Sequence, residues 1–339
     1  MRDRYLPALL LGWCLAVPPA SAQAPSDPAF PIGRGDRIVF IGNTFAERMQ
    51  LFPYFEALLT VHFPEDSLTF RNLGWSADEV TLQPRPLNFG DLHTHLAEQR
   101  ADIIFACFGM NESYAGPEGL PRFRSDLLGF LNGLLDHRYN GATPPRVVLV
   151  SPIAHENVQR VPLDPAAHNR DLALYTRAMR EVAAELGVRF IDLFTPTLEL
   201  FGDPALGDLT INGIHLNEHG YRLAGRLMAD ALGLLDPRPP GAEGDRFAQR
   251  EGVASARAPG LERLQQAIRE KNELFFYRWR PVNGEYVYGR RKEPFGVVNF
   301  PPEMQQLEEM IRAKEREIWT LAKAGSARIS RNGRDISIR

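Results

Sequence analysis

The stretch Asn212-Gly-Ile-His-Leu-Asn-Glu-His-Gly-Tyr221 joins a short turn to the start of a predicted helix. The turn places the Asn212 side chain three residues before His215, and the helix is expected to begin near Asn217. A near neighbour can hold an imidazole in one tautomer, and an imidazole directed outward in this way is suited to act as a general base. His215 is therefore the first candidate functional side chain.

Upstream of this stretch, short runs rich in Ile, Val and Phe alternate with amphipathic runs. The predicted strands are Arg37–Ile41, Leu68–Leu73, Ile103–Phe108, Arg146–Val150 and Arg189–Asp192, and the predicted helices are Ala46–Phe63, Arg122–Leu135, Asp171–Leu186 and one after Asn217. Strands with helices between them indicate a parallel sheet that is covered on both faces. The pattern predicts a three-layer α/β/α domain over residues 34–236.

Glycines and hydrogen-bonding residues follow every predicted strand. They are Gly42, Asn43 and Thr44 after the first strand, Gly74, Trp75 and Ser76 after the second, Gly109, Asn111 and Glu112 after the third, Ser151, His155, Glu156 and Asn157 after the fourth, and Asn212 and His215 after the fifth. In parallel sheets, ligands bind where the chain leaves the C-terminal ends of the strands. We therefore expect the functional site at this edge of the sheet.

The composition is ordinary for a soluble globular protein. The chain has 339 residues, of which 44% are hydrophobic and 24% charged, and its formal net charge is −3. This length allows a full hydrophobic core, and the mild acidity gives no reason to expect nucleic acid as a partner. No segment beyond the N-terminus is long and apolar enough to suggest a membrane span.

The N-terminus has the features of an export signal. Two arginines precede an apolar run over residues 6–17, and Ala20-Ser-Ala22 offers a cleavage site. We therefore expect a signal peptide over residues 1–22 and a periplasmic or extracellular protein after cleavage near Ala22. The mature chain would keep only Cys107, which we expect to be a buried free thiol rather than part of a disulfide.

The C-terminal third differs in composition from the rest. Residues 237–259 are rich in Pro and Gly and predict a linker, and residues 260–325 predict a helical extension with amphipathic helices at Gly260–Phe276 and Pro302–Lys323. Between these helices, aromatic residues alternate with arginines. They could stack on sugar rings, but packing against the main domain as a flap near the site is preferred. Residues 326–339 predict a mobile tail.

Four segments resemble, in order, sequence blocks of the SGNH (GDSL-type) hydrolases. They are Ile41-Gly-Asn-Thr44, Asn72-Leu-Gly74-Trp-Ser, Gly109-Met-Asn111-Glu112 and Asn212-Gly-Ile-His215. Each one alone could occur by chance, but all four stand in the family's order and at predicted strand ends. The resemblance implies a flavodoxin-like parallel sheet and an esterase that needs no cofactor and no metal.

The resemblance also assigns roles to residues. Acyl transfer needs a hydroxyl nucleophile, a neutral imidazole and preorganised donors for the developing oxyanion. By similarity, Thr44 stands at the position of the nucleophilic serine, and Gly74 and Asn111 stand at the oxyanion donors. His215 stands at the base, and Asn212 takes the place of the aspartate that completes the triad.

Two of these positions depart from the family pattern. Thr44 keeps a hydroxyl, but its extra methyl restricts χ1 and could block attack. Asn212 can orient the imidazole but cannot stabilise imidazolium by charge, and the corresponding change in a serine protease lowers kcat about 10⁴-fold. A carboxylate elsewhere on the rim could compensate, and we favour Glu112 over Asp208 and Glu156.

Several candidates also have a purely structural interpretation. Asn43, where the family usually has Asp, could hold the turn or cap the following helix together with Thr44. His155 could contact substrate or compensate for the missing acid. Ser76 and Ser113 are less favoured alternative nucleophiles.

Asp91, His93 and His95 could suggest a metal site. Two histidines at i and i+2 with one aspartate are more often a solvated face, so no metal is expected.

These observations predict an exported ester hydrolase that removes acyl groups from a carbohydrate-type substrate. The alternative is a catalytically inactive protein of the same fold that binds a glycan or another partner through the same rim. A third and weaker hypothesis is an assembly protein whose C-terminal helices pair with a partner. The sequence does not indicate an oligomeric state.

Overall fold

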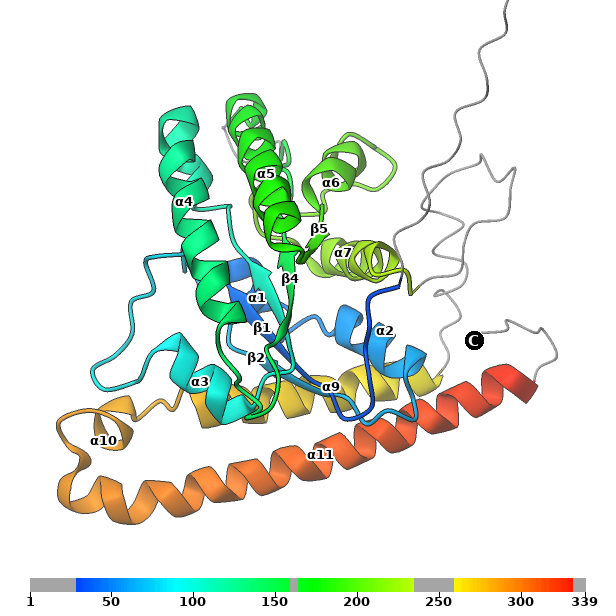
Figure 1. The fold of residues 1–339 in the computed structure, drawn as a ribbon. Helices are drawn as coiled ribbons and strands as arrows, with labels where there is room; N and C mark the ends of the chain where they lie inside the picture. The colour runs from blue at the N-terminus through cyan, green and yellow to red at the C-terminus, as the bar shows by residue number, and fades with distance from the viewer. Residues whose placement is uncertain (1–28, 159–163, 235–258, 332–339) are drawn as a thin grey trace, which may run out of the picture.

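The computed structural model describes residues 29–158, 164–234 and 259–331 (Figure 1). The predicted signal peptide and residues 237–258 of the predicted linker lie outside these ranges. Within them, no helix combines the length and apolar character that a membrane span requires.

Five parallel strands form one sheet in the order β2-β1-β3-β4-β5. They are β1 (Arg37–Gly42), β2 (Thr69–Asn72), β3 (Ile103–Cys107), β4 (Arg146–Val150) and β5 (Arg189–Ile191). This is the flavodoxin-like order, so the predicted parallel α/β sheet is confirmed. Strands β1, β3 and β4 are interior strands and almost entirely buried, which explains their continuous runs of Ile, Val and Phe.

Helices connect the strands and cover both faces of the sheet. They are α1 (Thr44–Arg48), α2 (Tyr54–His62), α3 (Leu92–Gln99), η1 (Glu112–Ala115), α4 (Gly116–Leu135), α5 (Ala166–Leu186), α6 (Phe194–Phe201) and α7 (Glu218–Ala231). The predicted helix Ala46–Phe63 is thus wrong in one respect, because it is two helices. Pro53 stands at the N-cap of the second, where its missing N–H and the restriction on its predecessor separate α1 from α2. Helices α3 and α6 were not predicted, and α4 and α5 begin earlier than expected.

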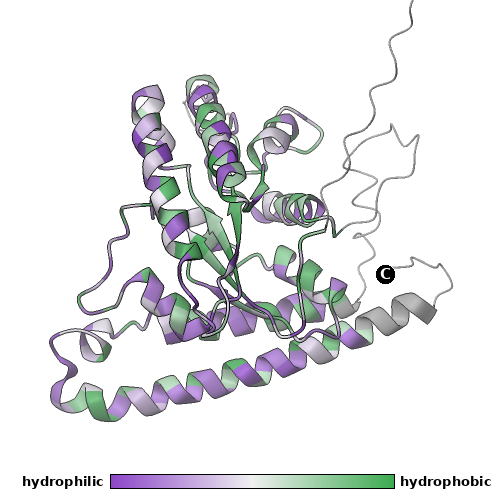
Figure 2. Ribbon diagram, viewed as in Figure 1, coloured by the Kyte–Doolittle hydropathy of each residue, from purple (hydrophilic) through white to green (hydrophobic). Residues whose placement is uncertain are grey.

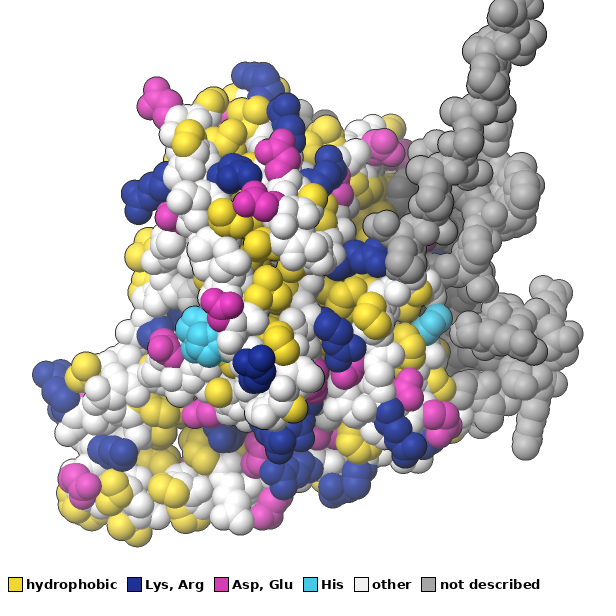
Figure 3. All heavy atoms as spheres, in the orientation of Figure 1, with side chains coloured by type: hydrophobic (Ala, Val, Ile, Leu, Met, Phe, Trp, Pro, Cys, Tyr) yellow, Lys and Arg dark blue, Asp and Glu magenta, His cyan; other side chains and the backbone are white. Residues whose placement is uncertain are grey.

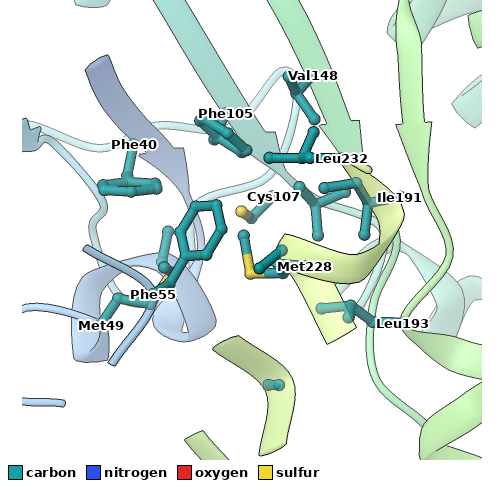
Figure 4. Packing of buried hydrophobic residues seen from close by; sticks show 14 of the residues in the cluster. Phe40, Met49, Phe55, Phe105, Cys107, Val148, Ile191, Leu193, Met228 and Leu232 are labelled. Carbon is teal, nitrogen blue, oxygen red and sulfur yellow. The ribbon is translucent and has the colours of Figure 1, made fainter. Parts of the chain in front are cut away.

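The hydrophobic core lies on both sides of the sheet. On one face, Phe40 and Phe105 of the strands point toward Phe55 of α2 and Met228 of α7 (Figure 4). On the other face, residues of α3, α4 and α5 pack against alternate strand positions such as Ile104. Figure 2 shows the hydrophobic residues concentrated in the strands between these helix layers. Cys107 is buried in the first of these clusters as a free thiol.

The C-terminal extension contains α9 (Pro259–Trp279), α10 (Gly284–Val287), η2 (Lys292–Gly296) and α11 (Val297–Arg331). Helices α9 and α11 lie side by side below the sheet (Figure 1). Acidic and basic side chains are mixed over this part of the surface (Figure 3). The extension covers the edge strand β2, because Lys271 donates to the Phe70 carbonyl (3.2 Å) and the Trp319 indole donates to the Leu68 carbonyl (2.8 Å). Edge strands expose unpaired backbone groups, and such a cover protects them.

Two predicted boundaries of the extension need correction. The first helix begins at Pro259, and α11 continues to Arg331, so residues 326–331 of the predicted tail are helical. The aromatic segment packs against the main domain, as the preferred interpretation expected. Phe275 and Trp279 are both buried in the same cluster as Phe89.

Candidate active site

A pocket opens at the C-terminal ends of the central strands and brings together four of the candidate site residues, Asn43, Thr44, Asn111 and His215. Its lining consists of Asn43, Thr44, Phe45, Cys107, Phe108, Met110, Asn111, Ser151, Pro152, Ile153, Ile214 and His215. Its empty volume is about 400 Å³, which includes space open to solvent. Thr44, Asn111 and His215, which lie far apart in the sequence, thus share one concave surface.

The turn after β1 presents Thr44 to this pocket. Gly42 has a φ of +119°, and a Cβ at this position would clash with the Cys107 carbonyl, so only glycine fits. Asn43 is the N-cap of α1, and its Oδ1 accepts from the Phe45 N–H at 3.0 Å. Thr44 is therefore the first residue of α1.

The Thr44 hydroxyl faces the loop after β2. Its Oγ1 accepts from the Ala77 N–H at 3.4 Å. Within the residues that the structure describes, no hydrogen bond joins this hydroxyl to His215. Attack by Thr44 therefore requires its hydroxyl to rotate toward the imidazole.

The side chain of Asn212 fixes the tautomer of His215. Its Oδ1 accepts from the backbone N–H groups of His215 (3.0 Å) and Ile214 (3.4 Å), so its amide nitrogen faces the imidazole, 3.0 Å from Nδ1. An amide nitrogen only donates, so Nδ1 accepts and the ring proton resides on Nε2. Nε2, the ring nitrogen that remains for the pocket, then carries a hydrogen and can only donate. A general base needs a nitrogen that accepts a proton at this place.

Burial lowers the pKa of His215 below its usual value, and the nearby charge of Arg48 lowers it further. The imidazole is therefore neutral at pH 7, as a general base must be. The obstacle to catalysis is the position of its proton and not its charge.

The backbone donors differ from those assigned by resemblance. The Gly74 N–H donates to the Asn72 side chain at 2.9 Å, so it is already engaged within the loop. Gly74 is needed for a different reason, because a Cβ there would clash with the backbone nitrogen of Glu47. The N–H that points at the Thr44 hydroxyl belongs to Ala77, whose φ is +65°.

Asn111 lines the pocket, and its amide nitrogen donates to the carbonyl of Asp78 at 3.3 Å. This bond holds the end of β3 against the loop that carries Ala77. Nothing in the sequence indicated that Ala77 is the donor near Thr44. There was a sign that the Gly74 N–H is engaged, because an Asn two residues before it can accept a hydrogen bond from that N–H within the turn.

Two of the three acidic candidates, Glu112 and Glu156, support loops. Glu112 accepts from the N–H groups of Val80 and Gly109, both at 2.9 Å, and burial raises its pKa. Glu156 accepts from the backbone of Leu209 (2.8 Å) and Thr210 (2.7 Å). The hypothesis that Glu112 replaces the missing acid is therefore not supported, because both of its oxygens are engaged elsewhere.

His155 also has a supporting role. Its Nδ1 lies 3.0 Å from Nδ1 of His168, whose Nε2 lies 2.8 Å from the Ser113 hydroxyl. Ser113 is fully buried and donates to the Met110 carbonyl at 2.7 Å. This chain of side chains links the loops after β3 and β4, so Ser113 is not available as an alternative nucleophile.

His155 and His168 should make the stability of the fold depend on pH. Burial lowers the pKa of His168 to about 4, and burial also lowers that of His155. The folded-state pKa of His168 lies below the unfolded value of 6.5. The free energy of unfolding therefore has its full value above pH 6.5 and decreases as the pH falls toward 4, where the histidine must be protonated. Urea unfolding at pH 7.0 and 4.5 should show this loss, which His168→Asn should reduce. An equal loss in the variant would contradict the assignment.

The remaining candidates have local roles. Ser76 donates to the Glu47 carboxylate. Asp91 caps α3 by accepting from the Thr94 N–H (2.8 Å), and His93 contacts the Tyr139 hydroxyl (2.7 Å). In the described part of the chain, no three His, Cys, Asp or Glu side chains are grouped so as to hold a metal ion.

The sequence matches the family model of the GDSL-like Lipase/Acylhydrolase family over residues 35–223, more than half of the chain. The chain belongs to this family. The matched range contains Thr44, Ala77, Asn111 and His215, and it ends before the C-terminal extension. No curated protein sequence matches the chain.

The fold of this chain also occurs in a solved structure. BT4096, described as a gut microbial diltiazem-metabolizing enzyme, aligns with a TM-score of 0.61 and 13% identity, covering 88% of this chain and 97% of its own. Residues 1–258 alone are fewer than 88% of the chain, so the alignment with BT4096 includes part of the C-terminal extension. Axe2, an acetylxylan esterase from Geobacillus stearothermophilus, aligns with a TM-score of 0.46 and 18% identity over 61% of this chain and 99% of its own.

Proposed function

We propose that this chain is an ester hydrolase that removes acyl groups from a carbohydrate-type substrate and does so slowly. The family supports ester hydrolysis. The observation that carries the proposal is a pocket that places a hydroxyl (Thr44), a neutral imidazole (His215) and the side-chain amide of Asn111 around one space. These are the groups that acyl transfer needs.

In this mechanism, the Thr44 hydroxyl attacks the ester carbonyl and gives its proton to His215. The Ala77 N–H and the Asn111 amide donate to the oxygen that gains negative charge. The imidazolium returns the proton to the leaving alcohol, and a water molecule activated by His215 then releases the acyl group from Thr44. Each cycle must first move the ring proton of His215 from Nε2 to Nδ1, which Asn212 disfavours. This requirement is the reason for the low rate.

The carbohydrate part of the proposal rests on the polar rim and on the expected export. Tyr114 lies three residues after the pocket residue Asn111, is 59% exposed and stacks on His168, which holds its ring in place. Exposed aromatic rings offer an apolar face that sugar rings can cover. Export through a signal peptide over residues 1–22, into the periplasm or the extracellular space, is part of the same proposal.

A second candidate function is glycan binding without turnover. The donation from Asn212 to Nδ1 of His215 favours it, because this tautomer cannot accept the proton of Thr44. The direction of the Thr44 hydroxyl toward Ala77 favours it as well.

Hydrolysis of an activated acetyl ester and of acetylated oligosaccharides separates the two functions. If the chain is an esterase, Thr44→Ala and His215→Ala should each lower kcat/KM by at least about 100-fold, because each removes a group that takes part in the reaction. Thr195→Ala, which changes an exposed threonine on α6 outside the pocket, is the matched control. Rates that are equal in all four proteins would contradict the esterase proposal and support the binding function.

A further inference from the structure

Arg280, the residue that follows α9, brings the C-terminal extension into contact with two segments that adjoin Thr44. Its guanidinium carbon lies 3.6 Å from the centre of the Trp75 ring, and its Nη1 forms an ion pair with Glu47. The side chains of this ion pair are only 19% and 14% exposed. Trp75 belongs to the loop that carries Ala77, and Glu47 belongs to the helix that begins at Thr44. Arg280 therefore contacts both segments that meet at the Thr44 hydroxyl.

Further contacts tie the same two segments together. The second carboxylate oxygen of Glu47 accepts from the Ser76 hydroxyl. A second guanidinium, that of Arg85, lies 4.5 Å from the Trp75 ring and pairs with both oxygens of Asp78, at 2.8 and 2.5 Å. The loop is thus held by two cation–π contacts and two ion pairs in a partly desolvated setting, where such contacts are strongest.

The loop needs this support because of Ala77. Its φ of +65° lies in the left-handed region, which is unfavourable for a residue with a Cβ. Ala77 is also exposed, so its own side chain is not anchored by packing. Without its neighbours the loop would relax, and the Ala77 N–H would turn away from Thr44.

We propose that Arg280 is a positioning residue that keeps the Ala77 N–H directed at the oxyanion position beside Thr44. The inference rests on the proposed function, since it assigns Ala77 the role of oxyanion donor. Arg280 lies outside the family match over residues 35–223. The orientation of a donor within the GDSL-like domain therefore depends on a segment that the family pattern does not contain.

The first test compares Arg280→Gln and Arg280→Lys in an Asn212→Asp background, in which turnover is expected to be higher. Loss of the guanidinium in Arg280→Gln should lower kcat for an activated acetyl ester by about 10- to 100-fold and change KM by less than about threefold, because a displaced donor weakens only transition-state binding. Arg280→Lys keeps the charge near Glu47 but loses the planar stack on Trp75, and it should recover part of kcat. Arg312→Gln, which breaks an exposed pair with Glu308 within α11, is the control.

The second test does not depend on turnover. Hydrogen exchange followed by mass spectrometry should show peptides over residues 73–82 exchanging at least about 10-fold faster in Arg280→Gln, with α9, α11 and β3 unchanged. Unchanged exchange of this loop would overturn the inference. Equal acceleration in α9 and α11 would also overturn it, because Arg280 would then hold the extension rather than the loop. If no variant shows turnover, the proposed function fails, and the exchange result still decides the role of Arg280.

Discussion

Replacing Asn212 by aspartate is expected to raise kcat/KM for an activated acetyl ester by about 10³- to 10⁴-fold. The carboxylate would keep the two backbone hydrogen bonds that Oδ1 now accepts. Its second oxygen would face Nδ1 of His215 and would accept a hydrogen bond from Nδ1–H, which places the ring proton on Nδ1 and leaves Nε2 free to take the proton of Thr44. The reverse change in a serine protease lowers kcat by about 10⁴, mainly through the wrong tautomer.

The new charge should also shift the pH dependence. In the wild type, burial lowers the pKa of His215, so activity should persist below pH 6.5. A carboxylate beside Nδ1 stabilises imidazolium and raises this pKa, so the acidic limb of the rate profile should move to higher pH. Asn212→Ala is the control, since it removes the amide that favours the wrong tautomer without adding a carboxylate, and its gain should be smaller than that of Asn212→Asp. A rate for Asn212→Asp equal to that of Asn212→Ala would contradict the tautomer argument.

Replacing Lys271 by methionine is expected to destabilise the fold by about 3–5 kcal/mol. Lys271 of α9 is 1% exposed and lies 2.6 Å from Glu56 of α2. Burial raises the pKa of Glu56, and the positive charge of Lys271 counteracts this shift. Without the lysine, the Glu56 carboxylate would have to stay charged without its ion-pair partner or take up a proton, and both cost free energy. Urea unfolding at pH 7 measures the difference.

Two variants make this prediction specific. Lys314→Met removes pairs with Glu270 and Glu317 on the surface of the extension, and the loss should stay below about 1 kcal/mol. The double variant Glu56→Leu/Lys271→Met should recover most of the stability lost in Lys271→Met, because it removes the Glu56 carboxylate that Lys271→Met leaves buried without its partner. A small loss in Lys271→Met, similar to that in Lys314→Met, would show that the buried pair does not anchor the extension.

The sheet could be predicted from the sequence because buried parallel strands have a simple pattern. Each of the five predicted strands overlaps an observed one, and the polar residues after them meet at one edge. The pocket residues Thr44, Asn111 and His215 followed from the same reasoning. Helix ends were harder to predict, as Pro53 shows, since a single proline divided a continuous amphipathic pattern into α1 and α2.

The details that decide catalysis depend on hydrogen-bond directions that the sequence does not contain. Asn212 was recognised as a departure, but only the engagement of its Oδ1 by two backbone groups shows which end of the amide meets His215. Ala77 was missed because its positive φ is imposed by its neighbours and not by its own residue type. The contact of Arg280 with Glu47 joins residues more than two hundred positions apart, which no local pattern can reveal.

The most direct test of the proposed mechanism is to trap the acyl group on the protein. Asn212→Asp would be mixed with an activated acetyl ester, quenched in acid within the first turnovers and digested for peptide mass mapping. The proposed mechanism predicts an acetyl group on Thr44 that is absent when Thr44→Ala or His215→Ala is added. Turnover with the acetyl group on another residue, such as Ser76, or turnover that survives Thr44→Ala, would contradict it.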